Sequence, residues 1–532
     1  MPKKWPLFAA LAVLVLSLCL TQAPALAATF IVNGYPADEP RYPGDDLKKI
    51  EAVDGAVSRY TDYANGFSLA YPAHMAVDWS LSAVRTVIAD DTTTIEVYYD
   101  NFSGLDTSAA EYIHYGNKFV RTAADHSIEA DRWLTVAGRQ AHILAWSRRP
   151  LARVANDKNH YASLEIIKND AEVYTIFVKS RQPIADPVAY AASLEIFERQ
   201  AAPGNYKRFM ASRTPMNAET QAFYNRYFGD TAPLRWGIFE PSAPQSLRTL
   251  SELEKRLDYS FPVLLHYQMF DEQFPAWGLE NAYQNKKYLE LTLQTTISGS
   301  VNALWTKDQS NAGLVYAILD GRYDDYFADY ADKLKAFGHP VLFRLDNEMN
   351  GDWCWYSAFY TGKDADLYKA LWRHIWQIFA ARGVDNVIWV WNPHDVSRPP
   401  FKWNHFLQYY PGDEYVDVIG LTGYNNGSYF AGERWREFAE IYPPLYDEYL
   451  MAFDKPLMIT EFSSNSVGGD KVAWIHRMFD NIKKLDRIKV AVWWSGVDFD
   501  QQGQPARIYL INENEAILDA FKDRLKEYKG SR

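Results

Sequence analysis

The chain has 532 residues and a formal net charge of −12 at pH 7. An acidic balance of this size argues against nucleic acids and anionic membrane surfaces as partners. The sequence contains no CxxC, HExxH or glycine-rich phosphate loop and no histidine cluster with metal-ligand spacing. We therefore expect no metal and no cofactor.

The N-terminus has the pattern of a secretory signal peptide. A basic start is followed by an apolar stretch over 7–20 and by Ala25-Leu-Ala27, which is typical of a cleavage site. The apolar stretch is too short to span a bilayer. We predict that residues 1–27 are removed and that the mature protein is secreted, with no membrane segment. Cys354 would then be its single cysteine, so no intramolecular disulfide is expected.

Two regions precede the largest domain. Residues 28–57 are rich in Pro, Asp and Gly and are predicted to be a linker. Residues 58–198 combine several β-type runs with expected helices at 109–124 and 187–197, which indicates a small α+β accessory domain. A second linker is expected at 199–232. For 58–198 we favour a spacer or a domain that associates with the cell wall over a carbohydrate-binding module.

From residue 233 to 532, apolar strand-like runs alternate with amphipathic helical segments. The expected strands are 235–239, 263–267, 314–318, 341–345, 387–391, 416–421, 457–460 and 490–494. Eight strands with intervening helices predict an α/β fold, a (β/α)8 TIM barrel.

Two expected strands lead into glutamates, Glu348 and Glu461, which are 113 positions apart (461 minus 348). In an α/β barrel the C-terminal strand ends form the active site. A single glutamate there can simply end a strand at a solvated rim, but two of them surrounded by Trp and Asn favour chemistry. Paired carboxylates are what glycoside hydrolysis requires.

Strand alternation gives a more detailed expectation. With period 2, Arg344, Asp346 and Glu348 would share one face, as would Leu457, Ile459 and Glu461. If that face is the barrel interior, Arg344 lies beneath the glutamates as a fixed positive charge. One carboxylate would then be kept ionised while the other holds a proton.

The segment Arg344-Leu-Asp-Asn-Glu348-Met-Asn-Gly-Asp-Trp353-Cys-Trp355 resembles the acid/base signature of glycoside hydrolase family 26, a retaining family that includes β-mannanases. The resemblance extends over about 233–525, with further motifs at 321–326, 387–393, 416–424 and 459–462. One position departs from it, because the family usually has His immediately before the acid/base and this chain has Asn347. Asn is the pattern of the wider clan of (β/α)8 retaining glycosidases, so the departure leaves the mechanism intact and the sugar specificity open.

The resemblance implies roles for individual residues. Glu348 would be the general acid/base and Glu461 the nucleophile that forms a covalent glycosyl-enzyme, with Tyr424 orienting the nucleophile. Retention requires the two carboxyl groups to lie about 5–5.5 Å apart. Residues expected to contact the sugar chain sit at strand ends or in the loops that follow; they are Asn347, Trp353, Trp355, Trp494, His266, Trp391 and Asn392. A lone His in an apolar strand such as His266 is as often a core residue, and Trp493 should face the helices.

The sequence thus predicts a secreted, retaining endo-β-glycanase whose partner is a polysaccharide, with β-1,4-mannan as the first expectation. Hydrolysis of mixed-linkage β-glucan or β-xylan by the same machinery is the alternative. A non-catalytic polysaccharide- or wall-binding protein on a glycosidase scaffold is an alternative of another class. The joint presence of Arg344, Glu348, Tyr424 and Glu461 argues against it.

Overall fold

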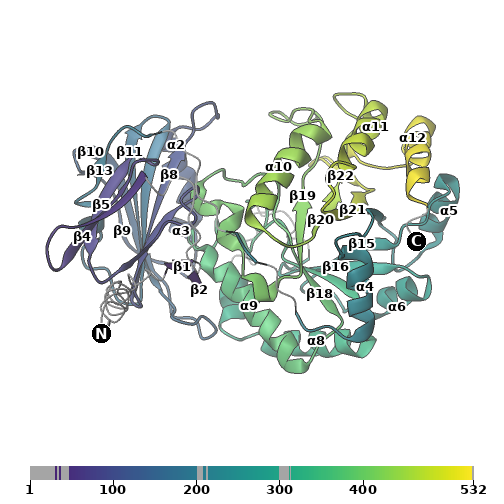
Figure 1. Ribbon diagram of the computed structural model, residues 1–532, viewed down its shortest axis with the longest axis horizontal. Helices are drawn as coiled ribbons and strands as arrows, with labels where there is room; N and C mark the ends of the chain where they lie inside the picture. The colour runs from purple at the N-terminus through teal and green to yellow at the C-terminus, as the bar shows by residue number, and fades with distance from the viewer. Residues whose placement is uncertain are drawn as a thin grey trace, which may run out of the picture.

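The computed structural model describes residues 30–32, 35–37, 47–200, 208–210, 214–298, 311 and 313–529. A β-rich N-terminal domain lies beside a barrel, next to helix α9 (Ala365–Arg382) (Figure 1). The expected signal peptide lies outside the described residues. Within them, no helix combines the length and apolar character needed to cross a bilayer.

The N-terminal domain is built on two antiparallel sheets. The larger has the order β6 (Ala76–Asp78), β7 (Thr86–Ala89), β8 (Thr93–Asn101), β12 (Glu172–Ser180), β11 (His160–Asn169), β10 (Arg139–Ser147) and β9 (Ser127–Val136). The smaller has the order β13 (Glu195–Ile196), β5 (Phe67–Pro72), β4 (Val57–Asp62) and β3 (Lys48–Ala52). Helices α2 (Ala109–Gly116) and α3 (Lys118–Thr122) follow β8, and a hairpin of β1 (Phe30–Val32) and β2 (Tyr35–Ala37) precedes both sheets. Part of the expected linker at 28–57 is therefore strand.

Both faces of the larger sheet are buried along its inner strands β10, β11 and β12, whose side chains alternate between two cores, whereas the edge strand β9 is mostly exposed. On β12, Tyr174 and Ile176 belong to the core shared with the smaller sheet. Val173 and Phe177 point the other way and join a core that continues into the barrel. One of the two hydrophobic cores of the N-terminal domain is therefore continuous with the core of the barrel.

The second domain is a closed parallel barrel of eight strands, which confirms the predicted TIM barrel. The strands are β14 (Arg235–Phe239), β15 (Val263–Met269), β16 (Tyr288–Gln294), β17 (Val341–Leu345), β18 (Val387–Trp391), β19 (Val418–Thr422), β20 (Leu457–Phe462) and β21 (Ile488–Trp494). The principal outer helices are α5 (Arg248–Leu257), α6 (Ala276–Gln284), α8 (Asp324–Phe337), α9, α10 (Phe438–Ala452), α11 (Lys471–Ile482) and α12 (Glu515–Leu525).

Other expected elements also differ from the structure. The expected helix at 187–197 is a 3-10 helix, Pro187–Ala191, followed by strand β13. Residues 314–318 lie in a buried helix, α7 (Leu314–Leu319), and the third barrel strand is β16. A short, continuously apolar run does not distinguish a buried helix from a buried strand, and β16 was obscured by its buried polar residues Glu290 and Thr292. The expected linker at 199–232 contains α4 (Ala218–Phe228), whose aromatic side chains pack into the apolar core of the barrel interior.

Candidate active site

Glu348 reaches the barrel mouth through a sharp turn after β17. Both Asp346 and Glu348 adopt positive φ, 46° and 56°, so strand alternation ends at Leu345. Asp346 does not share a face with Arg344 as expected, because its carboxylate accepts hydrogen bonds from the backbone N–H and hydroxyl of Thr295. The Glu348 N–H donates to the Asn392 carbonyl at 2.7 Å. This turn fixes the backbone beneath Glu348.

Glu461 faces the interior because β20 carries a bulge. The expected alternation was wrong here, since Leu457 and Ile459 pack in the outer core and Met458 lies inside the barrel. The register with β19 shifts after Ile459, so that Thr422 pairs with Glu461 instead of Thr460. One extra residue reverses the alternation and turns Glu461 inward, a known use of bulges beside active sites.

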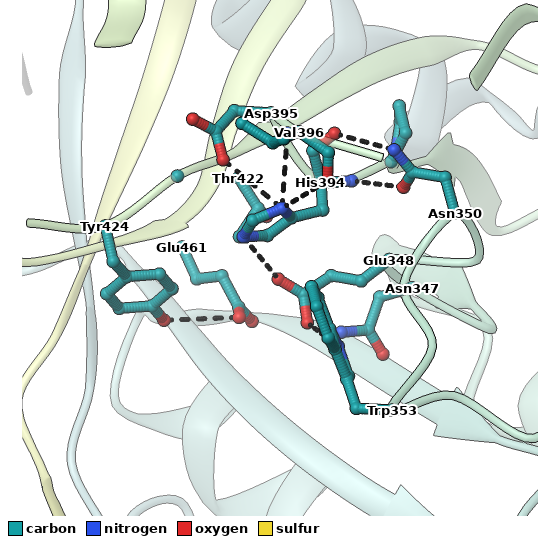
Figure 2. Close-up of polar contacts among 12 residues, drawn as sticks. Asn347, Glu348, Asn350, Trp353, His394, Asp395, Val396, Thr422, Tyr424 and Glu461 are labelled. Carbon is teal, nitrogen blue, oxygen red and sulfur yellow. Dashed lines mark hydrogen bonds and ion pairs between the residues drawn. The ribbon is translucent and has the colours of Figure 1, made fainter. Parts of the chain in front are cut away.

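Three donors bind the Glu461 carboxylate. Oε2 accepts a hydrogen bond from Arg344 Nη2 at 2.7 Å and another from the Tyr267 hydroxyl. Oε1 accepts one from the Tyr424 hydroxyl at 3.2 Å (Figure 2). Donors of this kind fix the orientation of a carboxylate and favour its ionised form.

Arg344 lies beneath the glutamates, fully buried, as alternation along β17 predicts. Its guanidinium also donates to Thr292 Oγ1 at 2.7 Å and to Asn392 Oδ1 at 3.0 Å. A second carboxyl group, Glu290, lies 3.2 Å from Arg344 Nε. Burial raises the pKa of Glu290 to about 8, so this carboxyl group is mostly protonated at neutral pH.

Glu348 has a different environment. Its Oε2 accepts a hydrogen bond from the Trp353 indole at 3.0 Å, and His394 Nε2 lies 3.9 Å from its Oε1 (Figure 2). The pKa of Glu348 is raised to about 7: burial is the largest cause and the nearby Glu461 adds to it, while His394, the Trp353 hydrogen bond and Arg344 act in the opposite direction. Glu348 therefore carries a proton over much of the acidic and neutral range, as a general acid must.

The other residues predicted to contact the sugar chain form two groups, one near the two glutamates and one buried elsewhere in the protein. Trp353 and Trp494 are half-buried at the mouth. Asn347, next to Glu348 in the chain, is only 2% exposed, and its Oδ1 accepts a hydrogen bond from Gln294 at 2.9 Å. Trp494 is half-buried and stacks on Phe239, with ring centroids 5.0 Å apart. His266 is half-buried near Gln245, and burial lowers its pKa to about 4.

Three residues predicted to contact the substrate are instead buried in the protein, where other side chains surround them. Trp355 and Trp391 are 1% and 0% exposed and pack against other aromatic rings, such as Tyr360 and Tyr410. Asn392 is buried below the site, where it holds Arg344 and the Glu348 backbone. Trp493 packs against α11 and α12, as expected.

Sequence reasoning missed four residues of the site: Tyr267, Glu290, Gln294 and His394. Tyr267 could have been predicted from strand alternation, because Val263, Leu265 and Tyr267 are the residues of β15 that face the barrel interior. His394 could not have been predicted, because it lies in the loop after β18 and no local sequence pattern indicates that it approaches Glu348.

Comparisons with known proteins find similarity over the part of the chain that contains the site. Residues 293–466, which include both glutamates, match the family described as glycosyl hydrolase family 26. Endoglucanase H of Acetivibrio thermocellus is 34% identical over 181 residues, 33% of this chain and 20% of that protein. A mannan endo-1,4-β-mannosidase of Bacillus subtilis strain 168 is 36% identical over 181 residues, 32% of this chain and 45% of that protein. The chain thus spans less than half of the length of either relative.

Among solved structures, a family 26 β-mannanase from Bacteroides ovatus is similar, with 17% identity, a TM-score of 0.44, and coverage of 59% of this chain and 94% of that one. The match of residues 293–466 to the model of glycosyl hydrolase family 26 agrees with the resemblance noted from the motifs.

Proposed function

We propose that the protein is a retaining endo-glycoside hydrolase that cleaves β-1,4-mannan by double displacement. One observation carries the proposal: two carboxyl groups share a barrel mouth in opposite electrostatic environments. Glu461 is held by Arg344 and two tyrosine hydroxyls. Glu348 is buried with its pKa raised to about 7. This difference separates a nucleophile from an acid.

In the first step Glu461 attacks the anomeric carbon while Glu348 protonates the departing glycosidic oxygen, which gives a glycosyl-enzyme and a free chain end. In the second step Glu348, now ionised, takes a proton from water, and the water oxygen replaces Glu461 at the anomeric carbon. Glu461 leaves as a carboxylate, and Arg344, Tyr267 and Tyr424 stabilise its returning charge. The net reaction adds one water across one glycosidic bond.

The nature of the polysaccharide rests on the relatives and on Asn347. One similar protein bears the name mannan endo-1,4-β-mannosidase, which favours mannan. Within the described part of the chain the Asn347 side-chain nitrogen makes no hydrogen bond, whereas its oxygen is bound by Gln294. The amide N–H groups are therefore available to the 2-hydroxyl of the sugar that is cleaved.

A β-glucan is the second candidate substrate. Another similar protein is named an endoglucanase, and Asn347 stands where family 26 usually has His. A binding protein without activity agrees less well with the site, because the donor set around Glu461 and the proton on Glu348 serve catalysis and not sugar binding. We also propose that residues 1–27 direct export, which N-terminal sequencing of the secreted protein would test.

Reducing-sugar release from mannan, glucomannan, mixed-linkage β-glucan and xylan tests the proposal, with the Glu461→Ala variant as the matched control. Release from mannan that disappears in the variant is the expected result. Release from mixed-linkage glucan alone would favour the second candidate. Binding to a polymer without release would overturn the enzymatic proposal.

A further inference from the structure

The loop that follows Glu348, residues 350–364, is held from outside the barrel. It connects β17 to α9, on the side of the barrel that faces the N-terminal domain (Figure 1). At its far end Lys363 donates to Glu165 Oε1 of β11 at 2.6 Å, with both groups buried. Asp364 accepts a hydrogen bond from the Tyr161 hydroxyl at 2.9 Å. The N-terminal domain therefore anchors this end of the loop through buried, charged contacts.

The near end of the loop is held in the same way, next to the acid/base. The hydroxyl of Tyr115, on α2, donates to Asp352 Oδ2 at 2.6 Å. The Tyr115 ring packs against Phe359, with centroids 4.9 Å apart. The carbonyl of Asp352 accepts a hydrogen bond from the Tyr360 hydroxyl. Both polar groups of Asp352 are thus fixed, one of them by the N-terminal domain.

The residue after Asp352 is Trp353, whose indole N–H donates to Glu348. Its ring lies so close to Gly351 that a Cβ there would be 2.5 Å from the indole. The other side of the indole meets His394 edge-on, with centroids 4.9 Å apart. Because the indole is confined in this way, a displacement of Asp352 moves the indole N–H relative to the Glu348 carboxyl group.

We propose that the N-terminal domain is part of the catalytic unit, and that Tyr115 is a positioning residue that acts through Asp352 to hold the Trp353 indole on Glu348. The proposal rests on the function proposed above for Glu348. It replaces the interpretation of this domain as a spacer. Domains that move independently meet through modest, polar interfaces, whereas this one shares a hydrophobic core and buried ion pairs with the barrel.

Tyr115→Phe tests the proposal, because it removes one hydroxyl and keeps the ring. Tyr112→Phe is the matched control: it lies on the same helix, and its buried hydroxyl is 2.6 Å from Thr175 Oγ1, away from the loop. Each variant is assayed in the full chain for kcat/KM on mannan and on a 2,4-dinitrophenyl β-mannobioside. The second substrate has a leaving group that needs no proton, so it reports everything except acid catalysis.

We expect Tyr115→Phe to lower kcat/KM on mannan about tenfold, since a small misplacement of a catalytic group is costly. The activated substrate should lose less than about twofold, because acid catalysis is not needed there. Tyr112→Phe should show no selective loss. Asp352→Ala should reproduce the selective loss, and the double variant should be no worse than Asp352→Ala alone, because the two residues act in one chain of contacts.

Equal losses on the two substrates, or no loss on mannan, would overturn the positioning role while leaving the proposed function intact. Additive effects of the two substitutions would overturn it as well. If the wild-type protein hydrolysed neither substrate, the proposed function would fail and this inference with it.

Discussion

Because Glu348 is the proposed general acid, Glu348→Ala should impair hydrolysis of mannan far more than hydrolysis of a substrate with an activated leaving group. With its pKa at about 7 in place of the ordinary 4.5, Glu348 is about 90% protonated at pH 6, against about 3% for an ordinary glutamate. Burial therefore raises the population of the acid form about 30-fold at this pH. Because the protonated form donates, kcat/KM on mannan should be flat below pH 7 and fall above it. The variant should lose about 10²- to 10⁴-fold on mannan.

The assay is kcat/KM from pH 5 to pH 9 on mannan and on the dinitrophenyl substrate, for both proteins. The ratio kcat/KM reports the first step, so loss of Glu348 as the base of the second step does not disturb it. The activated substrate should retain wild-type kcat/KM within a few-fold. A basic limb near pH 7 that persisted in Glu348→Ala, or equal losses on both substrates, would refute the assignment.

Three further outcomes follow from buried contacts. Glu461→Ala should stay folded because Glu290 can ionise and pair with Arg344. When Glu290→Gln is added to it, the free energy of unfolding should fall by about 3–5 kcal/mol more than the sum of the two single effects. Additive effects in urea titrations would contradict this. Asn347→Ala should lower kcat on mannan more than it raises KM, since the contact strengthens in the transition state; an effect on KM alone would contradict that role. Lys363→Met removes the ammonium group beside the buried Glu165, whose carboxylate keeps side-chain partners in Ser163, Asn117 and His142. The free energy of unfolding should fall by about 3 kcal/mol, the low end for breaking a buried ion pair, with both domains unfolding in one transition; separate transitions in denaturant would contradict a shared core.

Sequence periodicity was sufficient to predict most of the barrel strands of this protein. Seven of the eight expected barrel strands overlap strands of the structure, and both glutamates lie at strand ends. The prediction of the third strand was wrong, because Glu290 and Thr292 interrupt the apolar pattern of β16. The buried helix at 314–319 has a short apolar run that is typical of a strand.

Local irregularity and contacts between distant segments were not predictable in this way. Glu461 was placed on the correct face for the wrong reason, since a bulge and not strict alternation turns it inward. The positive φ of Glu348 and the approach of His394 depend on how loops from neighbouring strands pack. The burial of Trp355 depends on how its loop folds around Tyr360. The hydrogen bond from Tyr115 to Asp352, across 237 positions, exists only once the two domains are packed together.

Trapping of the glycosyl-enzyme tests the central claim most directly. A 2-deoxy-2-fluoro mannosyl substrate with an activated leaving group slows the second step, so that the covalent intermediate accumulates and intact-mass spectrometry detects it. We predict that one sugar adduct forms and that peptide mapping locates it on Glu461. A label on another residue, or sustained turnover of mannan whose first-formed product has the inverted anomeric configuration, would contradict double displacement through Glu461.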